Sequence, residues 1–268
     1  MELVADKLQE LEPLTAKNGA NGIHFIDKQK KVVLKCFKSL FQIEDREKMI
    51  DHLLLFQPIP KSGYPIDSLR VDGEFDGYVS PFFEDSVPFN RKNNYTFTQK
   101  IQACRDVSFQ LQKLHQRGII FHDMNSGNQL INADGGHLVD FEDVWIPGHR
   151  YPPRVRYFLY YQQNYLPSNM KQDQLKQYIS NLGLLYQMDL ESYFYQRGSL
   201  EQLPDLFEVN PTLKEFLQTN IAQVENQNVD ILDYFDAIIP SLEDEEKHEW
   251  EEVKLHENNI VQTLSLKK

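Results

Sequence analysis

Residues 119–142, which read IIFHDMNSGNQLINADGGHLVDFE, contain three polar side chains whose types and spacing could carry out chemistry. The carboxylate of Asp123 is followed five positions later by the amide of Asn128, and a second carboxylate, Asp140, follows two short apolar runs. One carboxylate can orient a hydroxyl nucleophile, while an amide and another carboxylate offer the oxygen ligands that Mg²⁺ accepts. This order and spacing indicate phosphoryl-transfer chemistry.

The residues between Asn128 and Asp140 predict a β-hairpin. Residues 129–132 form a short apolar run with strand character, and residues 137–139 would return antiparallel to it. Between the two runs, residues 134–136 are Asp-Gly-Gly, which supply the positive backbone angles of a tight turn. A hairpin places its two outer ends side by side, so we expect Asn128 and Asp140 to be neighbours in space.

This ordered set resembles the catalytic loop and metal loop of the protein-kinase-like superfamily, which includes protein kinases and the aminoglycoside and choline phosphotransferases. Residues 123–128 match the D-x-x-x-x-N loop of that family, and residues 140–142, Asp-Phe-Glu, stand where D-F-G usually stands. The resemblance implies that Asp123 is the catalytic base, that Asn128 and Asp140 are ligands of Mg²⁺, and that ATP is the phosphate donor.

Three positions depart from the pattern of the family, which are Phe121, His122 and Glu142. The usual H-R-D or H-G-D triplet is Phe121-His122-Asp123 here, so the histidine position holds a phenylalanine. The glycine of D-F-G is Glu142, which removes the backbone freedom that a glycine permits. We expect Glu142 to be a solvated or salt-bridged acid, with an approach to the metal as the alternative.

A nucleotide site also needs an N-terminal half, and residues 31–37 predict its central strand. This β-rich run resembles the V-A-I-K strand of kinases, with Val-Val-Leu-Lys ending at Lys35. Alternation along a strand puts Val33 and Lys35 on one face. Val33 would then cover the adenine, and Lys35 would reach the α and β phosphates. Upstream, Gly19 and Gly22 lie in a segment that resembles a shortened glycine-rich loop.

The ion-pair partner of Lys35 is expected on a helix. A helical pattern begins at residue 43 and continues through residue 54, and it carries several acids. The resemblance implies that Glu47 of this helix pairs with Lys35, with Glu44 as the alternative.

Two more segments are expected to complete the site, one as the hinge and one as the helix that leads into the catalytic strand. Residues 77–82 resemble the strand that leads to a hinge, and the main chain near Val79 and Ser80 would bond the adenine edge. Residues 97–117 place apolar side chains at helical spacing, and Gly118 would end that helix.

Together these elements predict an α+β fold of the two-lobed protein-kinase-like type, with a small antiparallel β-sheet N-lobe and a mainly helical C-lobe. We expect the N-lobe over residues 1–78, a hinge over 79–84, the C-lobe over 85–240 and an acidic C-terminal tail over 241–268.

Composition limits the classes of function. The chain of 268 residues is 41% hydrophobic, which suits a globular protein with a sizeable core. Its net charge of −12 argues against nucleic acid as a partner, because phosphate contacts need a basic surface. There is no run of about 18 or more apolar residues, so no membrane span is expected. Without the features of a signal peptide, the expected location is cytoplasmic, with delivery to another cell left open.

We therefore expect an ATP- and Mg²⁺-dependent phosphotransferase that moves the γ-phosphate of ATP to a hydroxyl acceptor. A serine or threonine of a protein is the preferred acceptor. A small molecule, as in aminoglycoside and choline kinases, is the alternative, favoured by Glu142 and by the absence of A-P-E after Asp140. The second alternative is a pseudokinase that binds partners without chemistry. A binding module would need none of the family's four polar residues, which are Lys35, Asp123, Asn128 and Asp140.

Overall fold

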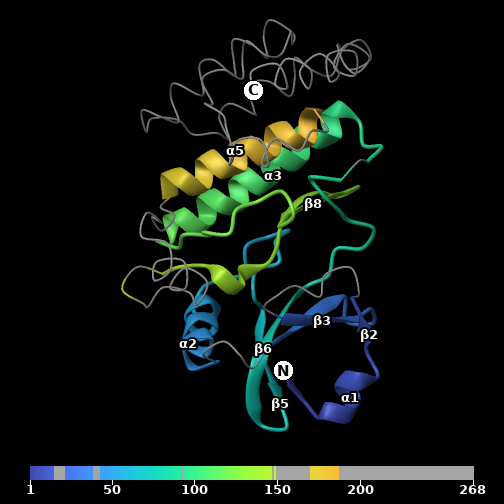
Figure 1. The fold of residues 1–268 in the computed structure, drawn as a ribbon, viewed down its shortest axis with the longest axis vertical. Coiled ribbons are helices and arrows are strands. Elements are labelled where there is room, and N and C mark those ends of the chain that lie inside the picture. The colour runs from blue at the N-terminus through green and yellow to red at the C-terminus, as the bar shows by residue number, and fades with distance from the viewer. Residues whose placement is uncertain (15–21, 39–42, 92, 147, 149–169, 187–268) are drawn as a thin grey trace, which may run out of the picture. The chain divides into compact units, whose positions relative to one another are not determined.

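The computed structural model describes residues 1–14, 22–38, 43–91, 93–146, 148 and 170–186 (Figure 1). Within these residues the chain forms two compact units. The first unit comprises Met1–Ser86, Gln110–Asp123 and the segment that begins at His137, and the second comprises Val87–Phe109, Met124–Gly136 and the residues from Lys171 onward. Both units contain strands and helices, so the fold is α+β. Gly19 and the expected acidic tail over 241–268 lie outside the described residues.

The first unit is built on a six-stranded sheet with the strand order β1-β5-β6-β4-β3-β2. The strands are β1 (Glu2–Leu3), β2 (Glu12–Pro13), β3 (Gly22–Asp27), β4 (Val32–Phe37), β5 (Asp67–Val71) and β6 (Glu74–Pro81). Neighbouring strands are antiparallel, except for β1 and β5, which are parallel. The prediction of an antiparallel sheet is therefore wrong at this edge, where the N-terminal residues add a parallel strand and make the sheet mixed.

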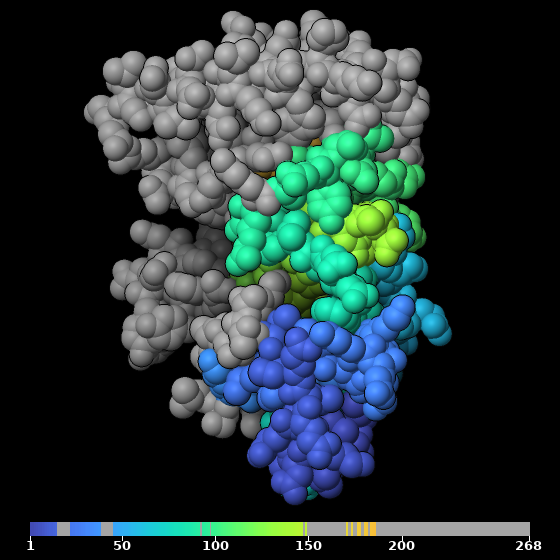
Figure 2. All heavy atoms as spheres, turned by 90° about the vertical axis from the view of Figure 1, so that its right-hand side faces the viewer, coloured from blue at the N-terminus to red at the C-terminus, as the bar shows by residue number. Residues whose placement is uncertain are grey.

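Helix α1 (Ala5–Gln9) explains how the chain reaches both edges of this sheet. It follows β1 at one edge and leads to β2 at the opposite edge, so this segment must cross one face of the sheet. Apolar residues of the segment pack there against a buried cluster made of Val32, Leu34, Cys36, Leu69 and Val79. Figure 2 shows the N-terminal segment, in dark blue, on the surface of the molecule. The even-numbered residues of β4 therefore belong to this apolar core.

The odd-numbered residues of β4 point to the other face, because successive side chains of a strand alternate. Helix α2 (Ile43–Leu54) covers this face, and the guanidinium of Arg46 lies 4.4 Å from the centre of the Phe37 ring. The buried residues of α2 have the spacing of one helical stripe, namely Arg46, Met49, Ile50 and Leu53. The predicted strand and helix are thus both confirmed.

The hairpin between Asn128 and Asp140 is also confirmed. Strands β8 (Gln129–Asn132) and β9 (Gly135–Leu138) are neighbours in a three-stranded sheet with the order β7-β8-β9, in which β7 is Val87–Pro88. The turn falls at residues 133–134, one residue earlier than predicted, and Gly135, whose φ is 121°, begins β9.

Helix α3 (Phe97–Gln116) agrees with the predicted helix, and Gly118 follows it with a φ of 73°. In the second unit α3 packs beside helix α5 (Met170–Tyr186), as Figure 1 shows, and Nε2 of Gln177 donates a hydrogen bond of 2.6 Å to Oγ of Ser108. No helix in the described part of the chain is long and apolar enough to cross a membrane.

Gly77 lies in β6 at a point where the backbone of β4 comes too close for any side chain. A Cβ atom at this position would overlap the carbonyl oxygen of Lys35. Since Gly77 is paired with Cys36 in the middle of the sheet, relief would require the two strands to separate. We expect Gly77→Ala to lower the free energy of unfolding by about 3 kcal/mol, measured by denaturant titration.

The matched control is Gly73→Asn, because the space around Gly73 is open and asparagine tolerates a positive φ such as the 87° found there. Its stability should stay close to that of the unmodified chain. A Gly77→Ala protein as stable as this control would contradict the close approach of the two strands.

Candidate functional site

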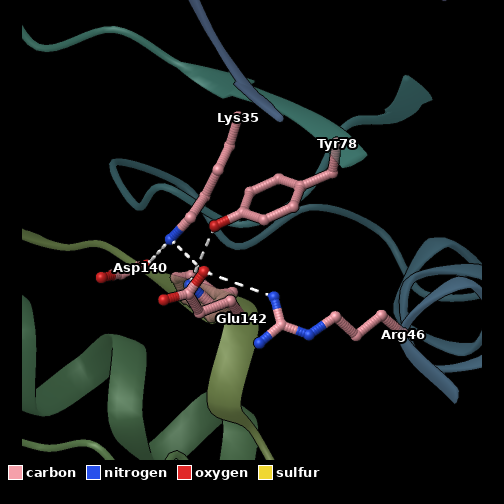
Figure 3. Close-up of polar contacts among 6 residues, drawn as sticks. Lys35, Arg46, Tyr78, Asp140 and Glu142 are labelled. Carbon is pink, nitrogen blue, oxygen red and sulfur yellow. Dashed lines mark hydrogen bonds and ion pairs between the residues drawn. The ribbon is translucent and has the colours of Figure 1, made fainter. Parts of the chain in front are cut away.

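Lys35 stands at the centre of the candidate site. It lies in β4 opposite Tyr78 of β6, and its side chain is buried. Its ammonium group forms one salt bridge with Asp140 and another with Glu142, in which Nζ lies 2.6 Å from Oε2 (Figure 3). Two residues that the sequence selected for different tasks, Lys35 and Asp140, therefore meet in the first unit although 105 positions separate them.

The segment that carries these acids begins with a strained backbone. Asp140 has φ 75° and ψ 63°, a left-handed conformation that costs a residue other than glycine about 1–2 kcal/mol. A short 3₁₀ turn over Phe141–Asp143 follows. The ring of Phe141 anchors it, because this ring meets Phe121 and Tyr64 edge-on, with 5.3 Å and 5.4 Å between ring centres. The turn is thereby held in one orientation.

Asp123 follows a residue with the same kind of strain, since His122 has a φ of 64°. The segment before Asp123 is joined to the residues after the 3₁₀ turn by a bridge between Ile120 and Trp145, whose two backbone hydrogen bonds measure 2.9 Å and 2.7 Å. Asp123 itself is half-buried. The predicted base and the predicted metal carboxylate Asp140 thus belong to one unit.

The charges of the site shift the pKa values of its members. Burial alone would lower the pKa of Lys35. The neighbouring groups, which in decreasing order of effect are Asp140, Tyr78 and Glu142, outweigh burial and raise this pKa above its ordinary value. The ammonium group therefore stays charged. Burial raises the pKa of Glu142, and the charge of Asp140 adds to that rise, while Lys35 and Arg46 oppose it. The site therefore favours a cation beside its acids.

Asp143 lies fully buried at the end of the 3₁₀ turn. Burial raises its pKa from 3.8 to about 7, with further contributions from the charges of Glu142 and Asp123. At a pH between these two pKa values, Asp143 is protonated in the folded chain and deprotonated in the unfolded chain. The stability contributed by this group is therefore full below pH 3.8 and declines as the pH rises towards 7.

Asp143→Asn should remove this dependence, because asparagine has the same shape and carries no charge. We expect the gain in melting temperature over the unmodified chain to be larger at pH 8 than at pH 5 in metal-free buffer. Thermal unfolding at the two pH values checks this result. An equal difference at both would show that the buried carboxyl does not titrate between them.

The structure corrects the predicted partner of Lys35. Glu47 bonds to Arg70 of β5, with 2.5 Å between Oε1 and Nη2, and the helix acid is therefore engaged away from the site. Lys35 pairs instead with Asp140 and Glu142, so the expectation of a solvated or salt-bridged Glu142 is met by a salt bridge. The side chain of Glu44 lies outside the described part of the structure.

The residue of α2 that points to the site is Arg46, with Nη1 lying 3.8 Å from Oε2 of Glu142. The sequence did not single it out, yet a signal was present. Met49, Ile50 and Leu53 form an apolar stripe whose N-terminal continuation, three and four positions back, is Arg46. A cation on a buried stripe needs an acidic partner, and this requirement could have found both Arg46 and its acid.

The expected nucleotide-binding residues fall into two groups. Val33 shares the odd-numbered face of β4 with Lys35, and Gly22 gives the lysine room, since a Cβ there would lie 3.2 Å from Cε of Lys35. By contrast, Val79 and Ser80 are paired within the sheet, and the carbonyl oxygen of Val79 accepts a hydrogen bond of 2.9 Å from the amide of Ile66. That oxygen is therefore engaged by the sheet, and main-chain contacts to an adenine would have to come from other atoms.

Asn128 belongs to the second unit, where it is buried just before β8. The side-chain oxygen of Asn125 shapes this loop by accepting hydrogen bonds from the amides of Gly127 at 2.9 Å and Asn128 at 3.1 Å. Because Asn128 and Asp140 belong to different units, their proximity stays a prediction.

The comparisons with known proteins identify no family. Neither the models of known protein families nor the curated protein sequences match this chain. Among the residues that the structure describes, no group of three or more His, Cys, Asp or Glu side chains is arranged to hold a metal ion. The geometry around Lys35 is therefore the main evidence for a function.

Proposed function

We propose that this protein is an ATP-dependent phosphotransferase with a two-lobed protein-kinase-like fold. The salt bridge between Lys35 and Asp140 carries the proposal. Sequence patterns selected these residues separately, one as a phosphate-binding lysine and the other as a metal-binding carboxylate. In phosphotransferases of this kind both groups act on the phosphates of the same nucleotide, so they must lie close together.

Backbone strain supports the same proposal. Among the described residues, six other than glycine have a positive φ angle, and two of these, His122 and Asp140, adjoin or are a proposed site residue. Strain of this kind concentrates at functional sites, where the surrounding structure maintains it. Phe121, which stands at the histidine position of the family triplet, packs its ring edge-on against Phe141. The ring contact joins the two loops of the proposed site.

In the proposed reaction, Asp123 accepts the proton of the acceptor hydroxyl as the oxygen attacks the γ-phosphorus and ADP leaves. Its half-buried carboxylate is accessible enough for such a contact. Lys35 neutralises charge on the nucleotide phosphates, and the fixed positions of both groups lower the barrier by orienting the reactants.

Asp140 suits a magnesium ion, because it offers carboxylate oxygens and its side chain is 26% exposed. Asn128 belongs to the other unit and stays a predicted ligand. Mg²⁺ commonly binds through one or two such ligands plus phosphate oxygens, so a closed protein cage is not required. When bound, the ion would neutralise charge on the phosphates.

Labelled ATP and Mg²⁺ test the proposal. The full chain is incubated with γ-labelled ATP and a cell lysate, and the label is followed in protein and in small molecules. We propose a serine or threonine hydroxyl of a protein as the acceptor, so label should appear on protein. An Asp123→Asn variant in parallel controls for contaminating kinases.

Two other outcomes are informative. Label on a metabolite would place the protein with the small-molecule phosphotransferases. No transfer at all, together with a melting temperature that ATP and Mg²⁺ do not change, would refute a phosphotransferase. Binding of nucleotide without transfer would point to a pseudokinase.

A further inference from the structure

Helix α2 is linked to Lys35 through a shared acid. Nη1 of Arg46 lies 3.8 Å from Oε2 of Glu142, and the same oxygen lies 2.6 Å from Nζ of Lys35 (Figure 3). None of the three side chains is more than 7% exposed. Water screens such buried charges little, so they interact strongly. Glu142 is therefore held between two cations in the interior of the first unit.

The strand that carries Lys35 also holds Arg46. The guanidinium of Arg46 lies over the ring of Phe37 at 4.4 Å, which is a favourable cation–π geometry. Phe37 and Lys35 are alternate residues of β4 and so share one face. Because α2 and β4 both fix Arg46, this arginine can orient Glu142 relative to Lys35.

The next residue of α2 forms an ion pair of a different kind. Glu47 bonds Arg70 at 2.5 Å, but their side chains are 31% and 40% exposed. Water screens a surface pair of this kind, and its contribution is small. Helix α2 therefore carries two adjacent ion pairs, one buried against Lys35 and one at the surface, which provides an internal control.

We propose that Arg46 is a positioning residue that acts through Glu142 to hold Lys35 where nucleotide phosphates bind. This arrangement reverses the one that the family resemblance implies, because the helix supplies the cation and the segment after Asp140 supplies the acid. The role rests on the proposed function, since it concerns affinity for the phosphates of a nucleotide. Without Arg46, Glu142 loses one of the two cations that orient it, and Lys35 loses a defined position.

The test is a double-mutant cycle on nucleotide affinity. Isothermal titration calorimetry measures the dissociation constant of Mg²⁺–ATP for the full chain and for Glu142→Gln, Arg46→Ala and the double variant. Each single change should weaken binding by about tenfold, and the double change should be no worse than the larger single one, because both break one link. Arg46→Lys should recover part of the loss, since it keeps the charge.

Two further variants separate this role from a general loss of structure. Arg70→Ala breaks the surface pair of the same helix and should leave the dissociation constant unchanged. Glu47→Gln should also have little effect, whereas the arrangement expected from the family would make it the more damaging acid substitution. Thermal unfolding confirms that each variant is folded, and Arg46→Lys takes the place of Arg46→Ala in the cycle if the latter does not fold.

The outcomes distinguish the two proposals. Non-additive losses in the cycle support the positioning role. Additive losses, or a larger loss for Glu47→Gln than for Glu142→Gln, overturn it while leaving the proposed function intact. If the unmodified chain binds no Mg²⁺–ATP, the proposed function fails, and the positioning role fails with it.

Discussion

Asp123→Asn is expected to lower kcat by about 10²–10⁴ while leaving the affinity for Mg²⁺–ATP almost unchanged. The amide has the shape of the carboxylate but cannot accept the proton of an attacking hydroxyl. In the proposed reaction Asp123 acts on the acceptor and not on the nucleotide, so the loss should appear in turnover. Steady-state kinetics with labelled ATP, together with calorimetric titration of nucleotide, measure the two effects separately.

The position of Asp123 provides a structural control for this variant. Its charge helps to raise the pKa of the buried carboxyl of Asp143, so Asp123→Asn should lower that pKa without unfolding the chain. The pH dependence of thermal stability reports this shift. Near-full turnover in a folded Asp123→Asn protein that shows the shift would remove Asp123 from the catalytic role.

Asp140→Asn is expected to reduce kcat/KM by about 10² or more, because it removes a carboxylate that would neutralise charge through the metal ion. Asparagine is the appropriate replacement at this position. It tolerates the left-handed backbone, φ 75° and ψ 63°, better than alanine does. The loss can therefore be attributed to charge and not to backbone strain. Kinetics over a range of Mg²⁺ concentrations measure it.

The same substitution also breaks the salt bridge to Lys35, and the metal dependence separates the two effects. If Asp140 is a metal ligand, Asp140→Asn should abolish most of the gain in ATP affinity that Mg²⁺ produces. If it serves only to hold Lys35, affinity should fall equally with and without Mg²⁺, as it should in Lys35→Met. The second pattern would contradict the assignment of Asp140 to the metal.

The elements around the site were predictable because their patterns are local. The β-rich run over residues 31–37 predicted β4, and apolar spacing over 43–54 predicted α2. Asp-Gly-Gly at 134–136 predicted a turn between β8 and β9, although Gly135 and Gly136 themselves belong to β9. Each pattern depends only on the period of a strand or helix or on the backbone freedom of glycine. Such requirements are set within a few residues.

The edges of the sheet were not predictable in the same way. Nothing in Glu2–Leu3 shows that this segment pairs parallel with β5, because the pairing joins residues far apart along the chain. It becomes favourable only when α1 crosses the sheet and its apolar residues cover the core. Burial of that shared apolar surface, which no local pattern contains, decides where the strand goes.

By itself, the sequence singled out Lys35, Asp123 and Asp140 as the candidates for phosphoryl transfer, because they stand in recognisable order within predictable elements. Only the tertiary structure decided that Glu142, and not Glu47, joins Asp140 beside Lys35. Glu47 and Glu142 have the same chemistry, but the stripe of α2 turns Arg46 inward and leaves Glu47 at the surface, while the anchored turn at Phe141 brings Glu142 to the lysine. A buried cation takes the acid that packing delivers to it, and packing depends on contacts between distant parts of the chain.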